Sequence, residues 1–208
     1  MSKKTIITIG RQFGSGGHAV GEKLSKQLGI PFYDKELIAM AAKESGYSEK
    51  LFEDVDEKPT NSFLYSLAMG SYIMGNSLSG AIDMPLNDKL FVIQSNIMQK
   101  IAAEGSCIIV GRCADYVLKE EHDCVKVFIH ADMEIRVKAI AKAFQVTDAK
   151  AEDMIIKTEK TRASYYNYFA NTHWGKVDNY HLTIDTGLIG VDNTVALIKS
   201  FVEMKHNL

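Results

Sequence analysis

Proline, tryptophan and cysteine are scarce in this sequence, and long hydrophobic runs are missing. Its 208 residues include 3 prolines, 1 tryptophan and 3 cysteines. No stretch reaches the roughly eighteen continuous apolar residues of a membrane span, so no membrane partner is expected. Charge of one sign is not in excess either, because 24 Lys and Arg residues stand against 26 Asp and Glu. Nucleic-acid-binding proteins usually have a basic surplus, so nucleic acid is not expected as a partner.

The cysteines and histidines show no spacing that indicates a metal site. Cys107, Cys113 and Cys124 form no CxxC pair, and an odd number of such residues is typical of free thiols in a reducing compartment. The apolar run Thr5–Ile9 is too short for the core of a secretory signal, and no cleavage site follows it. We therefore expect a cytoplasmic protein without a protein-bound metal.

Short β-branched runs alternate with long helical patterns, which is typical of βαβ units around a parallel sheet. The expected fold is α/β, a three-layer α/β/α sandwich with a parallel five-stranded sheet, in a single domain over residues 1–208. Strands are expected at Thr5–Ile9, Pro31–Tyr33, Cys107–Val110, Val125–Ile129 and His181–Ile184. Helices are expected at His18–Leu28, Lys35–Glu44, Asn87–Glu104, Met133–Phe144, Ala149–Asn171 and Asp192–Lys205.

Two segments interrupt this alternation. The first, at about 47–86, has no charged residue over 59–82 and is rich in Ser, Gly, Met and aromatic residues. An uncharged surface of this kind is either an insert that covers the acceptor or the contact of a homodimer. The second segment, at about 145–176, is a long helical stretch that ends in aromatic residues, and we interpret it as a lid.

The most informative segment is the glycine-rich loop Gly10–His18 (GRQFGSGGH), which directly follows the first expected strand. Glycines let successive backbone N–H groups converge on an anion, and the N-terminus of the next helix adds partial positive charge. The sequence therefore predicts a phosphate-binding loop of the P-loop type. The residues expected to hold the phosphates are Gly14, Ser15, Gly16, Gly17 and His18.

The loop departs from the standard motif G-x-x-x-x-G-K-[ST]. Aligned on Gly16, the motif places Arg11 at its first glycine, Gly17 at its lysine and His18 at its serine or threonine. The missing lysine neutralises the transferred phosphoryl group, and the missing hydroxyl binds Mg²⁺. Arg11 and His18 are candidates to supply the missing positive charge. The alternatives are a salt bridge at the rim of the loop for Arg11 and an exposed position at the start of the helix for His18. Without a replacement, the protein is a catalytically impaired nucleotide- or phosphate-binding module.

A second motif overlaps the loop. Gly14–Ala19 (GSGGHA) fits the dinucleotide pattern G-x-G-x-x-[GA], and Asp34 follows about twenty residues later, as that fingerprint requires. The turn of that fingerprint is tight, whereas residues 11–13 widen the loop here. The wider loop favours the P-loop hypothesis, and a dinucleotide-binding oxidoreductase stays open as an alternative.

Four segments together resemble the cytidylate kinase-like family. They are 7–18 (ITIGRQFGSGGH), 29–38 (GIPFYDKELI), 109–115 (IVGRCAD) and 160–166 (KTRASYY), so that the resemblance spans nearly the whole chain. It implies a P-loop NTPase fold of the nucleoside monophosphate kinase type. It also implies phosphoryl transfer from ATP, with Mg²⁺, to a nucleoside monophosphate such as CMP, and hence a small-molecule nucleotide as partner.

The resemblance also assigns roles to residues at the strand ends. Asp34 would face the acceptor or a Mg²⁺-bound water, and Arg112 would grip the acceptor monophosphate and base. In the family's Gly-Arg-Asp element the Asp directly follows the Arg, whereas Cys113 and Ala114 come before Asp115 here. The open alternatives are a helix N-cap for Asp34 and a structural salt bridge for Arg112.

By the same resemblance, Lys157, Lys160 and Arg162 would form a lid over the phosphates. Lys157 and Lys160 share a helix face, but Arg162 lies off it, so all three meet one phosphate only if the helix breaks. A surface pair of Glu159 with Arg162 is the alternative. The expected catalytic residues are Arg11, His18, Arg112, Lys160 and Arg162, and the expected substrate-binding residues are Asp34, Arg112 and Asp115.

Overall fold

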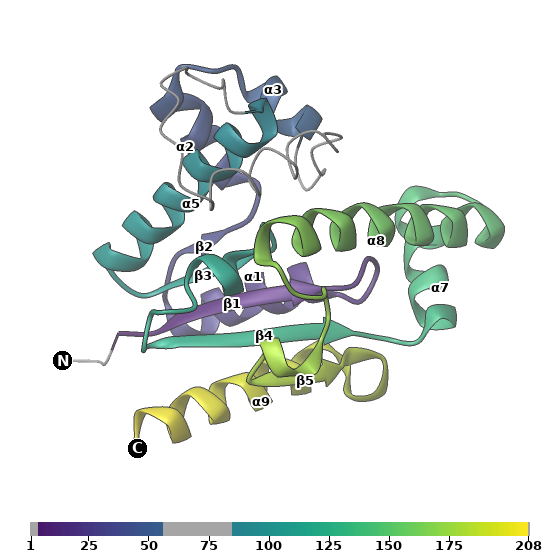
Figure 1. Ribbon diagram of the computed structural model, residues 1–208. Helices are drawn as coiled ribbons and strands as arrows, with labels where there is room; N and C mark the ends of the chain where they lie inside the picture. The colour runs from purple at the N-terminus through teal and green to yellow at the C-terminus, as the bar shows by residue number, and fades with distance from the viewer. Residues whose placement is uncertain (1–3, 56–84, 208) are drawn as a thin grey trace.

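The computed structural model describes residues 4–55 and 85–207. In these residues five strands form one parallel sheet in the order β2-β3-β1-β4-β5 (Figure 1). The central strand β1 lies between β3 and β4, and its Ile6 is in register with Cys107 on one side and Cys124 on the other. The strands are β1 (Ile6–Arg11), β2 (Phe32–Tyr33), β3 (Cys107–Val110), β4 (Cys124–His130) and β5 (Leu182–Asp185).

Helices cover both faces of the sheet. Side chains alternate along β1, so that Ile7 and Ile9 pack against α1 and α9, while Ile6 packs into the core beneath α2 and α5. Two hydrophobic cores on opposite faces make the three-layer α/β/α sandwich that the sequence predicts. The helices are α1 (Gly17–Leu28), α2 (Glu36–Ser45), α3 (Glu49–Val55), α5 (Leu86–Glu104), α6 (Ala114–Val117), α7 (Met133–Phe144), α8 (Asp148–Ala170) and α9 (Thr186–His206).

The last helix begins earlier than its apolar pattern suggests, at Thr186 instead of Asp192. The Asp185 carboxylate accepts hydrogen bonds from the N–H groups of Gly187 and Leu188 and so caps this first turn. Gly190, with φ 76°, then interrupts the helical backbone. The short helices α3 and α6 were not expected, because neither is long enough to show a helical period.

The segment at about 47–86 is described only at its two ends. Helix α3 and the start of α5 belong to it, whereas the uncharged stretch 59–82 and the homodimer contact predicted there lie outside the described residues. Within the described part of the chain, no helix is long and apolar enough to cross a bilayer.

Helix α8 runs above β1 and β4, with α7 at its far end (Figure 1). Its aromatic end packs against α5, where the rings of Phe91 and Phe169 stack at 3.9 Å and Tyr165 meets Phe169 edge-on at 4.9 Å. These rings belong to a smaller hydrophobic core beside the main ones.

Candidate active site

The loop between β1 and α1 presents unused backbone donors. Gly14 and Gly16 have φ values of 83° and 79°, a left-handed conformation that glycine adopts without a Cβ penalty. Among the described residues, no group accepts a hydrogen bond from the N–H of Gly14, Gly16 or Gly17. Because these donors lie at the start of α1, they can bind an anion with the help of the helix dipole.

Ser15, unlike its glycine neighbours in the loop, uses its polar groups in hydrogen bonds within the protein. Its hydroxyl donates to the carbonyl oxygens of Gln12 at 2.9 Å and Ile129 at 3.2 Å, so the side chain is already used inside the protein. Its own carbonyl accepts a 2.6 Å hydrogen bond from Thr186 Oγ1. Ser15 therefore ties the loop to β4 and α9, and its hydroxyl does not replace the missing motif hydroxyl.

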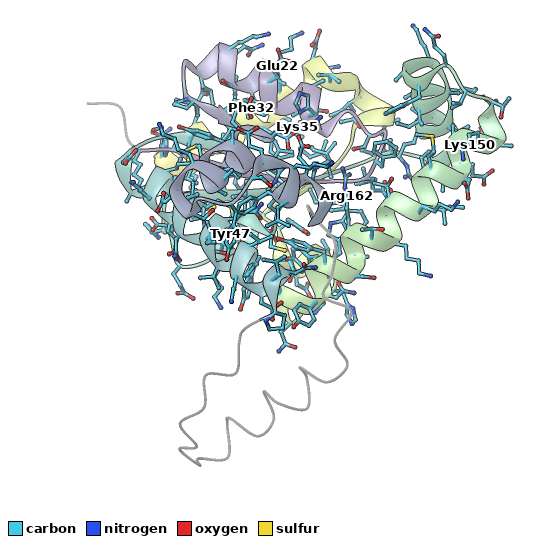
Figure 2. The ribbon with its side chains drawn as sticks, turned by 90° about the horizontal axis from the view of Figure 1, so that it is seen from above. Glu22, Phe32, Lys35, Tyr47, Lys150 and Arg162 are labelled. Atoms are coloured by element: carbon cyan, nitrogen blue, oxygen red, sulfur yellow. The ribbon has the colours of Figure 1, made fainter. Side chains whose placement is uncertain are left out.

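A pocket of about 310 Å³ opens in front of this loop. Lys35, from the β2–α2 connection, and Arg162, from α8, both line it (Figure 2). Among the described residues that line the pocket, Asp34 is the only carboxylate, and the cations outnumber it. Such a surplus of positive charge suits a polyphosphate. The lining residues are Arg11, Gln12, Phe13, Gly14, Gly16, Gly17, His18, Asp34, Lys35, Arg112 and Arg162.

Asp34 joins two of the predicted site residues. Its Oδ2 lies 2.8 Å from His18 Nδ1, and its Oδ1 accepts a 2.9 Å hydrogen bond from Arg112. Burial raises the pKa of Asp34, but the charges of Arg11 and Arg112 and the bonds from Arg112 and His18 outweigh burial and lower the pKa overall. The carboxylate is therefore charged at neutral pH, and its two oxygens are both engaged.

Arg112 forms the structural salt bridge that was the alternative to its binding role. Its side chain is only 2% exposed, and Asp34 is the carboxylate that it meets. Arg112 and Cys113 have φ values of 52° and 57°, which cost non-glycine residues about 1–2 kcal/mol each. Asp34, in turn, does not cap α2, because Lys35 occupies the N-cap position and the Asp34 N–H donates to Glu36 Oε2.

Helix α8, the segment predicted to be a lid, contributes Arg162 to the pocket and leaves Lys160 outside it. Arg162 donates to the Arg11 carbonyl at 3.3 Å, and its guanidinium lies 5.6 Å from the centre of the Phe13 ring. Lys160 is exposed and does not line the pocket, because residues two apart on a continuous helix point in different directions. Helix α8 does not break, so the structure brings only one of the expected lid cations to the pocket.

Arg136 and Glu159 do not line the pocket but hold its loop, and their pairing was not predicted from the sequence. The Glu159 carboxylate accepts hydrogen bonds from Arg136 and from the N–H of Phe13, the latter at 3.3 Å. The buried Arg136 guanidinium also donates to the carbonyls of Ala131 at 2.8 Å and Phe13 at 3.4 Å. The ion pair thus ties α7 and α8 to the loop. Glu159 pairs with Arg136, and no local spacing indicates that partner.

Asp115 lies beside the pocket and not in it. It is 6% exposed and accepts a 2.6 Å hydrogen bond from the hydroxyl of Tyr166. Burial raises its pKa, although the Tyr166 bond lowers it in part. The cavity next to it measures about 20 Å³, which is room for a single water and not for an acceptor.

Comparison with known proteins identifies the family of this chain. The sequence matches the cytidylate kinase-like family over residues 6–188. The chain belongs to this family. Among curated proteins, a cytidylate kinase of Methanopyrus kandleri is 23% identical over 97% of this chain and 95% of the relative. A cytidylate kinase of Saccharolobus islandicus is 24% identical over 96% of this chain and 91% of the relative.

Solved structures with a similar fold point the same way. An uncharacterized protein from Eubacterium ventriosum is 26% identical and superposes with a TM-score of 0.72 over 96% of this chain and 99% of that one. A shikimate kinase from Bacteroides thetaiotaomicron, 14% identical, has a TM-score of 0.55 over 97% and 99% of the two chains. These neighbours confirm the P-loop kinase fold. The family and the curated relatives confirm the expected phosphotransferase class.

The topology also decides against the dinucleotide-binding alternative. In the doubly wound dinucleotide-binding fold the second strand pairs with the first. Here β3 lies between β2 and β1. The hypothesis of an oxidoreductase with that fold is therefore wrong, although Gly14–Ala19 matches the dinucleotide pattern.

Proposed function

We propose that this protein is a kinase that transfers the γ-phosphoryl group of ATP to a nucleoside monophosphate, CMP-like, or to a related small acceptor. One observation carries the proposal: the unused N–H groups of Gly14, Gly16 and Gly17 line the same pocket as Arg11 and Arg162. Phosphoryl transfer depends on positioning and on neutralising the transferred group, and this pocket offers both. CMP leads among acceptors because the curated relatives that cover the chain are named cytidylate kinases.

The two sides of the pocket suit different parts of the reaction. The loop amides suit the donor phosphates, and Arg162 enters from α8 above them. His18, Asp34 and Arg112 form one hydrogen-bonded unit where β2 and β3 end, and we assign this unit to the acceptor side. Because Arg112 is engaged with Asp34, its effect on the acceptor is exerted through the position of that carboxylate.

Magnesium fits this pocket as part of Mg²⁺–ATP more than as a resident ion. The described residues contain no cluster of three potential metal ligands, and Mg²⁺ commonly keeps its waters and uses one or two carboxylates plus substrate phosphates. Asp34 is the lining carboxylate, and it would hold the ion through water. When bound, Mg²⁺ would offset the negative charge of the phosphates.

A coupled assay for ADP release tests the proposal directly. Purified protein is incubated with Mg²⁺–ATP and each of the common nucleoside monophosphates, and with hydroxyl acceptors such as shikimate in a separate series. We expect turnover with CMP above the other acceptors. Turnover only with a hydroxyl acceptor would reassign the substrate, and folded protein without turnover on any acceptor would contradict the proposal.

A binding module without transfer is the second candidate. It is favoured by the altered motif, in which Gly17 stands for the lysine and His18 for the hydroxyl residue. Calorimetry separates the two candidates, because a module binds ATP or CMP with a measurable affinity and releases no ADP. A kinase shows both the affinity and the release.

We also propose a cytoplasmic location. The three cysteines are buried free thiols. Burial raises the pKa of Cys107 and Cys124 to about 11, which keeps both thiols protonated and unreactive. Unpaired thiols of this kind suit a reducing compartment.

A further inference from the structure

Position 17, where the standard motif has its lysine, has no room for a side chain in this protein. A Cβ atom placed on Gly17 lies 2.5 Å from Cβ and 3.1 Å from Cγ of Arg11. These atoms are next to the backbone of β1 and cannot swing away as the end of a flexible side chain can. With Arg11 in place, any larger residue at position 17 therefore forces the strand and the helix apart.

The reverse constraint holds for position 11. Arg11 is the last residue of β1 and is in register with Ile129 of β4, so its backbone is held by the sheet. Gly17 is the first residue of α1 and faces Arg11 across the loop. Only one of these two positions can carry a side chain. The standard motif has glycine at the first position and lysine at the second, and this chain has the opposite arrangement.

We propose that Arg11 does the work of the missing lysine, as a catalytic residue whose guanidinium contacts and neutralises the transferred phosphoryl group. Compared with the standard motif, the positively charged residue is at position 11 instead of 17, and the glycine is at position 17 instead of 11. The loop between these positions binds the phosphates. This inference rests on the proposed kinase function and goes further by assigning the residue that replaces the motif lysine.

The surroundings of Arg11 support this assignment. Its side chain lines the pocket together with the loop glycines, and it also borders the smaller cavity beside Arg112. Its positive charge lowers the pKa of Asp34 against the effect of burial, which puts that charge on the carboxylate side of the pocket. A guanidinium can bind two phosphate oxygens at once, which an ammonium group cannot do in the same fixed geometry.

The other cations of the pocket are less suited to this task. Arg112 is tied to Asp34, and Lys35 is exposed on the β2–α2 connection. Arg162 comes from α8 and reaches the loop by its hydrogen bond to the Arg11 carbonyl. Arg11 starts from the strand that leads into the loop, so the sheet itself sets its distance to a phosphate bound there.

An exchange of the two residues provides the test. The variants are Arg11→Met, Arg11→Gly, Gly17→Lys and the double variant Arg11→Gly/Gly17→Lys, which restores the standard arrangement. We expect Arg11→Met and Arg11→Gly to lower kcat at least about a hundredfold, while the KM for the acceptor stays the same. Gly17→Lys alone should also lose activity, because its side chain meets Arg11. The double variant should regain at least about tenfold over either single variant.

Controls separate charge from folding. Arg11→Met keeps the Cβ and Cγ atoms that pack against Gly17, so it should stay folded with a cooperative thermal transition, although loss of the charge near Asp34 lowers its melting temperature. Lys150→Met removes a cation from the exposed start of α8 (Figure 2) and should leave kcat unchanged. The inference is overturned if folded Arg11→Met retains the wild-type kcat, or if the folded double variant is no more active than the single ones.

The inference can fail independently of the proposed function. If wild-type protein turns over and Arg11→Met does so equally well, the kinase function stands and only the role of Arg11 is lost. If wild-type protein turns over no acceptor, the test is the binding affinity of each variant for adenylyl imidodiphosphate, an ATP analogue whose γ-phosphoryl group is not transferred. Arg11→Met should then weaken this affinity and the double variant should restore it, and equal affinities in all variants overturn the inference.

Discussion

Asp34 connects the first turn of α1 to the end of β3. One oxygen of its carboxylate lies 2.8 Å from His18 Nδ1, and the other accepts a 2.9 Å hydrogen bond from Arg112. The His18 ring also packs against Phe32 in a T-shaped contact with the ring centres 5.3 Å apart, so the imidazole has a second neighbour besides Asp34. The position that carries a hydroxyl in the standard motif is thus linked here, through Asp34, to Arg112.

Replacement of Asp34 should therefore be costly for stability. Asp34→Asn removes the charge that faces Arg112, whose side chain is 2% exposed, and breaking a buried pair from one side costs about 3–5 kcal/mol. Urea denaturation measures this loss in the free energy of unfolding. Asp192→Asn is the matched control, because its pair with Lys23 is exposed and should contribute at most about 1 kcal/mol. Equal effects of the two variants would contradict the central role of Asp34.

The same carboxylate predicts a pH dependence. The pKa of Asp34 is lower in the folded protein than in the unfolded chain, where it is about 3.9. Its contribution to stability is therefore fully present above about pH 4 and is lost as the pH falls through the lower, folded value. The free energy of unfolding of wild type and Asp34→Asn should differ most at neutral pH and converge in acid. A difference that grows towards acid pH would have the wrong sign.

The sequence predicted the frame of this molecule well, because that frame depends on local patterns. Alternation along β1, with Ile7 and Ile9 to one core and Ile6 to the other, is visible as a β-branched run. The glycines at the start of α1 and at its C-cap, Gly29, mark the helix ends. All five strands and the expected helices are present, with ends that differ mainly where a cap such as Asp185 adds a turn.

The side-chain partners in the site were harder to predict. Glu159 has Arg162 one turn away on its own helix, yet it pairs with Arg136 of α7, because the packing of α7 against α8 brings these two together. Asp34 was predicted to be a substrate-binding residue and does line the pocket, but its bonds to His18 and Arg112 depend on the order of strands in the sheet. Sequence spacing gives no access to contacts made between distant elements.

The pair of Arg136 and Glu159 should couple helix α8 to the glycine-rich loop. Arg136→Met leaves the Glu159 carboxylate, 18% exposed, without its cation and also frees the carbonyl of Phe13. We expect a loss of about 3 kcal/mol in the free energy of unfolding and a higher KM for ATP, because the loop is less well held.

The double variant Arg136→Met/Glu159→Met is the control for this effect. It removes both charges, so no unpaired carboxylate remains, and it should be more stable than Arg136→Met alone. Denaturation and ATP kinetics on the same samples check both parts. If Arg136→Met alters stability and leaves the KM for ATP unchanged, the ion pair supports the fold without positioning the loop.

Asp115 gives the opposite sign of pH dependence. Burial raises its pKa, so the folded protein favours the protonated carboxyl, and the stability it provides is present below about pH 3.9 and is lost as the pH rises through the folded value. Asp115→Asn keeps the shape and an acceptor for Tyr166 but carries no charge. We expect its free energy of unfolding at neutral pH to equal or exceed that of the wild type, with the gap closing in acid.

Asp115→Ala leaves the Tyr166 hydroxyl without its acceptor and should cost about 1–3 kcal/mol. A raised KM for CMP in Asp115→Asn, at unchanged stability, would instead return Asp115 to the substrate site.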